Sequence, residues 1–345
     1  MKLDYSYLVQ GRTALMGFCI IWIYLFHITT KSIFLDSFSQ IGWCGVDCFF
    51  LLSGIGLSYS LERDKNIIGF YKRRAFRILP TWWFLIFGFH IINLIANRPC
   101  PGTFLQVLLY YSGIGWFFNG FFQTEKIAWS EWYVPTLLLF YIASPLIHRM
   151  SIRSLIKTII ILFIINIVLS LFHLCDSLRL SYFRVPSFLL GFLIFKIILK
   201  YKVSNSKCIS FNIAILINFF LFVCGYLCLF LFSDLSATTK HPATFFESIG
   251  AVLISLGVLQ LVSYMSRVKK INILLSVFGK VSLELYLLHV FFISIAWRLR
   301  TELPIPDTAS ILIALFIYLI MSVIVSKFVK YIVKIYKNKC CTILN

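Results

Sequence analysis

The chain has 345 residues, of which 60% are hydrophobic and only 13% charged, and its mean hydropathy is +0.90. This composition excludes an ordinary soluble domain and indicates a polytopic membrane protein. The net charge of +19 would suit a nucleic-acid partner, but the basic residues lie in short loops between apolar runs, as the positive-inside rule produces. We therefore predict an all-α membrane bundle that binds no nucleic acid.

A transmembrane helix needs about 20 predominantly apolar residues, and about ten runs of the chain are long enough. An eleventh run, 104–122, is interrupted by Ser112-Gly113-Ile114-Gly115 and is expected to be re-entrant or interfacial. With both termini cytosolic, ten spans place most of the 32 Lys and Arg residues on the cytosolic side, whereas an eleventh span destroys this asymmetry. The expected spans of this single membrane domain, 1–345, are 13–31, 41–60, 79–97, 132–149, 155–174, 182–200, 210–232, 245–265, 274–297 and 309–334.

Neither the start of the chain nor its cysteines indicate another class of protein. No signal peptide precedes Arg12, so we expect the first apolar run to be an uncleaved anchor. The ten cysteines are mostly scattered inside apolar runs without the spacing of metal ligands, and we interpret them as small buried apolar residues. No metal site is predicted.

Ionisable residues inside spans are costly and by default indicate function. His27 follows Arg12 by fifteen residues, which is roughly 22 Å at the rise of a helix, so it belongs to the outer half of the first span. The second span runs inward, which puts Asp47 in the outer half too.

Three further ionisable residues are expected at similar heights. Glu131 opens the fourth span from the outer side, and the ninth span carries Glu284 near its middle and His289 in its outer half. One such residue is often a satisfied core group, but a set from four spans predicts a shared polar cavity.

A histidine in such a cavity suits proton transfer or nucleophilic work. A neutral imidazole takes a proton from a hydroxyl, and a nearby carboxylate fixes its tautomer and stabilises the imidazolium. By depth, Asp47 is the candidate to orient His27.

The basic segment 71–80 lies on the opposite side, in what we interpret as an arginine-rich loop before the third span. Arg74 and Arg77 are three residues apart and share one face if the segment is helical. Guanidinium groups suit phosphates, and Arg77 at the membrane surface is the better placed to hold an anionic ligand. The alternative is a set of ordinary cytosolic charges or lipid-headgroup contacts.

At these residues the chain resembles the acyltransferase-3 family of integral membrane acyltransferases, which O-acylate cell-surface polysaccharides and related acceptors. The resemblance covers nearly the whole chain and rests on Phe26-His27, Gly45–Gly54, Arg74–Pro80, Glu131–Pro135 with Tyr141 and Pro145, Arg184–Gly191 and Gly279–His289.

The resemblance implies a ten-helix fold and a cytosolic acyl-CoA donor, usually acetyl-CoA, with Arg74 and Arg77 near its phosphates. It implies His27 as the essential catalytic group and no permanently bound cofactor. The matching motifs add Trp132 and Tyr286 to the residues expected in the cavity with Glu131, Glu284 and His289. One position departs from the family: Met16 stands where a basic residue is common, and Arg12, one helical turn lower, is the candidate to replace it.

The leading hypothesis is an O-acetyltransferase that moves an acyl group from acyl-CoA to a sugar hydroxyl of a cell-envelope glycan or its lipid-linked precursor. His27 acts as general base or as a transient acyl carrier, and the expected location is a bacterial cytoplasmic membrane, among lipids. A transporter or flippase of a sugar-lipid or anionic substrate is the alternative, since intramembrane ionisable residues and broken helices also suit transport. A non-catalytic subunit whose polar groups join helices is a third.

Overall fold

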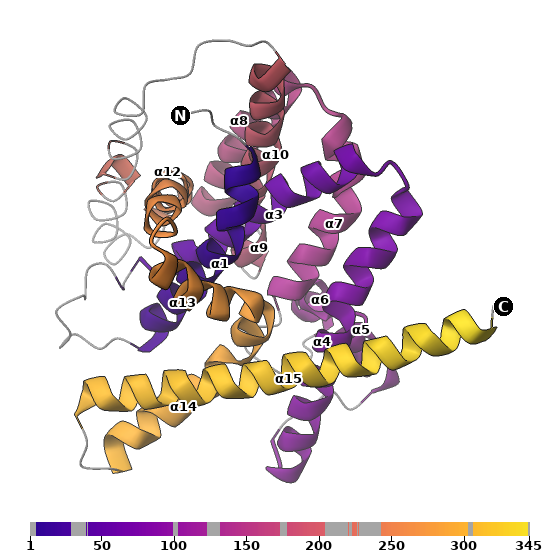
Figure 1. Ribbon diagram of the computed structural model, residues 1–345, viewed down its shortest axis with the longest axis vertical. Coiled ribbons are helices and arrows are strands. Elements are labelled where there is room, and N and C mark those ends of the chain that lie inside the picture. Colours follow the sequence, from indigo (N-terminus) through magenta and orange to yellow (C-terminus); the bar gives the residue numbers. More distant parts are fainter. Residues whose placement is uncertain are drawn as a thin grey trace. The chain divides into compact units, whose positions relative to one another are not determined.

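The computed structural model describes residues 5–28, 39, 41–98, 103–122, 132–172, 178–203, 220, 223–225, 227, 243–302 and 306–343, and these residues contain helices but no strand. The all-α prediction is therefore confirmed. In chain order the helices are α1 (Tyr5–Ile28), α3 (Cys44–Arg63), α4 (Ile67–Ile95), α5 (Phe104–Tyr111), α6 (Gly115–Phe122), α7 (Tyr133–Arg149), α8 (Ile152–Leu171), α9 (Arg179–Tyr182), α10 (Val185–Val203), α12 (Ala243–Met265), α13 (Lys269–Lys280), α14 (Ser282–Glu302) and α15 (Asp307–Ile343) (Figure 1).

Among the described residues, six helical segments are long and apolar enough to cross a membrane, or seven if α13 and the start of α14 form one broken span. They are α1, α3, α4, α8, α9 with α10, and α15. The chain is thus a multi-pass membrane protein. The expected span 210–232 lies almost entirely outside the described residues, so the count of ten and the cytosolic termini stay predictions.

The expected span 274–297 is not one continuous helix. Helix α13 ends at Lys280, a turn follows at Val281, and α14 begins at Ser282. Hydropathy did not reveal the break because Val281 is itself apolar and the run continues through it.

The interrupted run 104–122 forms two helices of eight residues, α5 and α6. Thr103 caps α5 by accepting a hydrogen bond from the backbone N–H of Gln106. Gly113 separates the two helices with φ at 76°, a left-handed conformation that suits glycine. Each helix is far shorter than the roughly 20 residues of a span.

The basic segment 71–80 is helical, which corrects our interpretation of it as a loop. It forms the middle of α4, whose start at Ile67 is capped by the side chain of Asn66 accepting from Gly69 N–H at 2.8 Å. Lys and Arg favour helices, and the helix continues through Pro80, as membrane helices often do.

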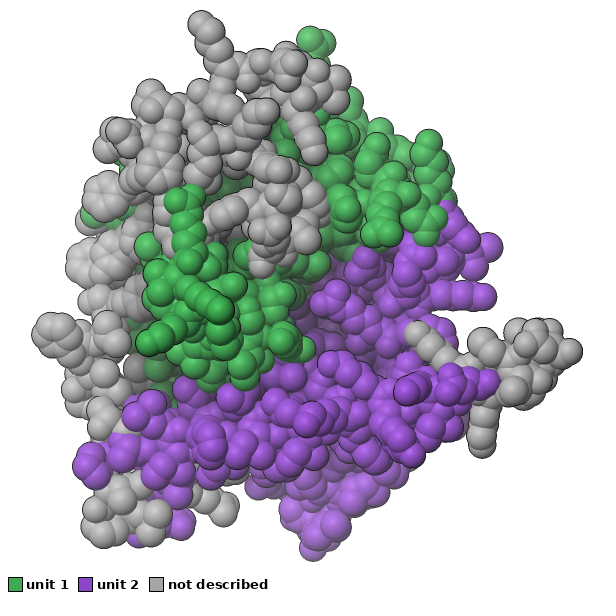
Figure 2. All heavy atoms as spheres, in the orientation of Figure 1, with its two compact units in different colours: residues 1–65, 143–280 green, residues 66–142, 281–345 purple. Residues whose placement is uncertain are grey.

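The chain divides into two compact units, each built from two separated stretches (Figure 2). Unit 1 contains Met1–Lys65 and Ala143–Lys280, and unit 2 contains Asn66–Ile142 and Val281–Asn345. Unit 1 therefore holds α1, α3, α8, α9, α10, α12 and α13, unit 2 holds α4, α5, α6, α14 and α15, and α7 belongs to both.

In unit 1, α3 and α10 form a closely packed parallel pair. A Cβ on Gly54 would collide with the backbone of Phe188 and Gly191, and a Cβ on Gly191 with the backbone of Leu51 and Gly54. The ring of Tyr59 contacts that of Phe195 further along both helices, at 6.5 Å between centroids. The two glycines thus set the distance between the helices, as small residues do in membrane bundles.

Helix α1 packs against a different side of α3 from α10 and runs antiparallel to α3. A Cβ on Gly45 would meet Cys19 and one on Gly42 the backbone of Trp22, while the guanidinium of Arg12 lies over Gly56. Low residue numbers of α1 therefore lie beside high numbers of α3.

In unit 2, α15 packs against α14 and α4. Tyr318 of α15 donates its hydroxyl hydrogen to the carbonyl of Leu285 in α14. Phe328 contacts Phe84 at 5.2 Å and Tyr336 contacts Phe76 at 6.2 Å between ring centroids, so α15 and α4 run antiparallel.

Candidate functional site

His27 lies in the last turn of α1. Its side chain is exposed, whereas Trp22, Ile23 and Tyr24 just before it are fully buried. The ring meets Phe26 edge-on at 4.8 Å between centroids. Helix α1 is thus anchored by its buried residues and carries the imidazole at its accessible end.

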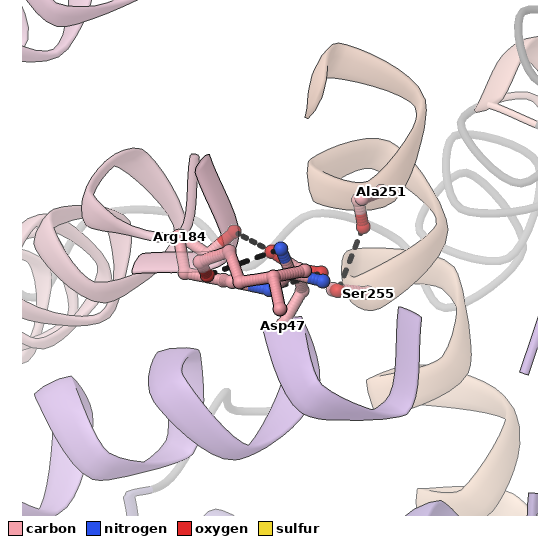
Figure 3. A network of polar contacts seen from close by, with 6 residues as sticks. Asp47, Arg184, Ala251 and Ser255 are labelled. Carbon is pink, nitrogen blue, oxygen red and sulfur yellow. Dashed lines mark hydrogen bonds and ion pairs between the residues drawn. The ribbon is translucent and has the colours of Figure 1, made fainter. Parts of the chain in front are cut away.

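Asp47 is buried in the first turn of α3 and pairs with the start of α10 (Figure 3). Ser187 donates its hydroxyl hydrogen to Asp47 Oδ1 at 2.9 Å, and Arg184 Nε faces Oδ2 at 3.9 Å. Arg184 also donates from Nη1 to the carbonyl of Leu180 at 3.1 Å, and its guanidinium lies over the ring of Trp43 at 5.9 Å. The buried carboxylate therefore has a buried counter-charge and a hydrogen-bond donor.

Asp47, the residue expected to orient His27, pairs with other residues in this structure. Cys48, the neighbour of Asp47, lies beside Cys19 of α1, which puts Asp47 about seven residues, or roughly 10 Å along the helix, below His27. The carboxylate also points to α10 rather than to α1. The pairing was predicted because His27 and Asp47 have similar depths in their two spans. The register of α1 against α3 and the direction of the Asp47 side chain exclude a direct hydrogen bond between them.

Arg184 and Ser187 are absent from the residues predicted for the site. The available signal was an arginine immediately before an apolar helix, within the motif Arg184–Gly191. Figure 3 also shows Ser255 of α12 pointing toward this pair, with its hydroxyl donating to the carbonyl of Ala251 at 2.7 Å.

A second polar cluster lies near the other end of α3. His148 of α7 contacts Ser58 Oγ through Nδ1 and Glu62 Oε2 through Nε2, both at 3.2 Å. Hydroxyl, imidazole and carboxylate follow the order of a hydrolytic triad. Ser58 is fully buried, however, so its hydroxyl offers no route to a substrate. The cluster joins α3 to α7.

Arg74 lies in unit 2 between two aromatic rings. Its guanidinium carbon is 5.4 Å from the ring centroid of Phe70, one turn earlier in α4, and 5.9 Å from that of Tyr141 in α7. Its buried Nε has no hydrogen-bond partner. Cation–π contacts of this kind hold a guanidinium without occupying its N–H donors.

Arg77 and Glu284 lie within electrostatic range of each other. Glu284 is buried at the start of α14, and the groups facing its carboxylate include Ser326 and Lys330 of α15 and Arg77 of α4. Sequence depth placed Glu284 near the middle of its span, at a height similar to that of the other polar residues, whereas in the structure its carboxylate interacts with Arg77 of the basic segment. The helix break at Val281 is the reason, because α14 starts only two residues before Glu284.

Four rings form a continuous row in unit 2. Trp132 contacts Tyr133 at 6.1 Å, Tyr133 contacts Tyr286 at 4.3 Å, and Tyr286 contacts His289 at 5.1 Å between centroids. His289 is buried and its Nδ1 bonds to the carbonyl of Tyr286. A carbonyl only accepts, so Nδ1 carries the hydrogen and Nε2 of the neutral ring is the basic nitrogen. Tyr133, which was not predicted for the site, joins the predicted residues.

The remaining candidate, Glu131, lies outside the described residues. His27 and Asp47 belong to unit 1, and the other described candidates to unit 2. Within the described part of the chain, no group of three or more His, Cys, Asp or Glu residues is placed to hold a metal ion.

Fold and site together define a polytopic α-helical membrane protein with arginine, histidine and carboxylate groups set into apolar helices. A family model described as an acyltransferase domain matches residues 14–329. The chain therefore belongs to the acyltransferase-3 family.

Its relatives include the O-acetyltransferase OatA of Staphylococcus aureus strains NCTC 8325 / PS 47, COL and MRSA252. Each is 26% identical over 184 residues, which cover 46% of this chain and 28% of the relative. The chain thus spans well under half the length of these relatives. No solved structure matches it.

Proposed function

We propose that this chain is a membrane O-acetyltransferase that uses cytosolic acetyl-CoA to acylate a sugar hydroxyl of a cell-envelope glycan or its lipid-linked precursor. The family match over residues 14–329 is the observation that carries this proposal, because His27, Arg74 and Arg77 all lie within it. The similarity to OatA supports acetyl as the group transferred. The proposed location is the cytoplasmic membrane of a bacterium.

Arg74 and Arg77 bind phosphates of the donor in this proposal. Guanidinium groups form charge-assisted hydrogen bonds with phosphate oxygens. The rings of Phe70 and Tyr141 restrict the Arg74 side chain, which lowers the entropy lost on binding.

His27 carries the chemistry in one of two ways. As general base, its imidazole takes the proton of the sugar hydroxyl while the oxygen attacks the thioester carbonyl, the C–S bond breaks, and the proton passes to the CoA thiolate. As acyl carrier, the imidazole nitrogen attacks the thioester carbonyl and the C–S bond breaks, and the ring proton passes to the thiolate to give CoA thiol. The sugar oxygen then takes the acetyl group, and the hydroxyl proton returns to the freed imidazole. Its exposure at the end of α1 supports both routes.

Replacing His27 tests this proposal most directly. We expect His27→Ala to lower glycan acetylation at least about 100-fold, the size of a lost general base, while the protein still inserts and binds acetyl-CoA. Mass analysis of glycans from cells carrying each variant measures the acetyl increment, and calorimetry on protein in nanodiscs measures donor binding. His90→Ala is the matched control, because it removes another imidazole from an apolar helix, in contact with Tyr111.

Normal acetylation in the His27→Ala strain would refute the assignment of His27. A wild-type protein that binds no acetyl-CoA, or binds it equally well after Arg74→Ala with Arg77→Ala, would favour a transporter or flippase, which has no need of that donor.

A further inference from the structure

A third cation lies beside the arginine motif in unit 2. Lys330 of α15 and Arg77 of α4 belong to different helices, yet both lie within electrostatic range of the buried carboxylate of Glu284. Both side chains are themselves exposed.

The packing of α15 on α14 explains why Lys330 reaches this place. Tyr318, Ser322, Ser326 and Lys330 recur every four residues and so form one stripe along α15. Tyr318 bonds to Leu285 of α14, and Ser322 and Ser326 are buried. The stripe thus follows α14 and ends in Lys330, its first charged and exposed member.

The packing of α15 on α4 brings Arg77 to the same region. The ring contacts Phe84–Phe328 and Phe76–Tyr336 hold the stretches 76–84 and 328–336 together. Arg77 lies within the first stretch and Lys330 within the second. Three helices therefore bring one buried carboxylate and two exposed cations together.

We propose that Lys330 is a further donor-binding residue, which holds a phosphate group of acyl-CoA together with Arg77. This inference rests on the proposed function and extends it, since the motif Arg74–Pro80 assigns phosphate binding only to residues of α4. The buried negative charge of Glu284 attracts both cationic heads to the same region, and both side chains remain exposed to an incoming anion. An anionic lipid headgroup has the same phosphate chemistry, and the experiment separates the two sources.

The test compares Lys330→Gln with Lys327→Gln, in nanodiscs of zwitterionic lipid. Lys327 is equally exposed and lies three residues earlier in α15, but Lys330 and not Lys327 is among the groups that act on the Glu284 carboxylate. We expect Lys330→Gln to weaken CoA binding about 10-fold, the size of a lost charge-assisted hydrogen bond, and Lys327→Gln to change it less than about twofold. Binding of pantetheine, which carries no phosphate, is expected to be the same in both variants and in the wild type.

Three results would overturn the inference while leaving the proposed function intact. They are unchanged CoA affinity in Lys330→Gln, an equal loss in both variants, and a loss that appears only when phosphatidylglycerol is added to the nanodisc. The last would assign Lys330 to a lipid headgroup. Failure of the wild-type protein to bind CoA would instead overturn the proposed function itself.

Discussion

The two ends of α3 each carry a carboxylate paired with a cationic or ionisable partner from another helix, but in opposite environments. Asp47 pairs with Arg184 at side-chain exposures of 4% and 8%, whereas Glu62 pairs with His148 at 51% and 18%. In the first pair both charges are removed from water, so each depends on the other. In the second, water already solvates much of Glu62, and little is gained by the pairing.

This difference shows that a carboxylate paired with a basic side chain contributes differently to stability at the two ends of one helix. The Asp47 end joins α3 to the start of α10 through Arg184 and Ser187 and is sensitive to any unpaired charge. The Glu62 end joins α3 to α7 and is expected to tolerate change. Between them, Gly54 and Gly191 keep the helices in close contact.

Breaking the buried pair is expected to have the largest effect. Arg184→Gln leaves the Asp47 carboxylate buried without its counter-charge, which destabilises the protein by about 3–5 kcal/mol. Thermal unfolding of the purified protein in detergent measures this. Adding Asp47→Asn should recover part of the loss, because no charge then stays unpaired.

The control for this prediction is Arg179→Gln, which removes an exposed arginine from α9. Equal losses from Arg184→Gln and Arg179→Gln, or no recovery in the double variant, would mean that the buried pair does not stabilise the fold.

Pushing α3 and α10 apart at their glycine contact, between the two ends of α3, is expected to have an intermediate effect. Gly191→Leu places a side chain against the backbone of Leu51 and Gly54, which must shift, and overpacking of this kind costs about 1–3 kcal/mol. Gly88→Leu in α4 is the matched control, since no atom lies within 4 Å of a Cβ built there. Similar unfolding temperatures for both variants would show that α3 and α10 do not pack through their glycines.

The exposed pair is expected to give the smallest effect. Glu62→Gln keeps the shape of the side chain and removes its charge, and we expect a change in stability below about 1 kcal/mol. The same unfolding assay measures it. A loss as large as that of Arg184→Gln would remove the contrast between the ends of α3.

Much of the candidate site was predictable because hydrophobic runs interrupted by charge are visible in a linear sequence. The runs placed His27 near the end of α1 and Asp47 near the start of α3, whereas Arg74 and Arg77, which we interpreted as part of a loop, belong to α4. The apolar run 274–297 hid the break at Val281, however, and with it the position of Glu284 in the first turn of α14.

The sequence by itself determined the all-α membrane class, the acyltransferase-3 family and the order of the polar residues along the chain. Only the tertiary structure decided which of them meet: Asp47 with Arg184 and Ser187 rather than His27, Glu284 with Arg77 and Lys330, and Tyr286 with Tyr133. The physical reason is that hydropathy reports how deep a residue lies. Helix register and side-chain direction depend on close contacts such as Gly54 with Gly191, which join residues far apart in the chain.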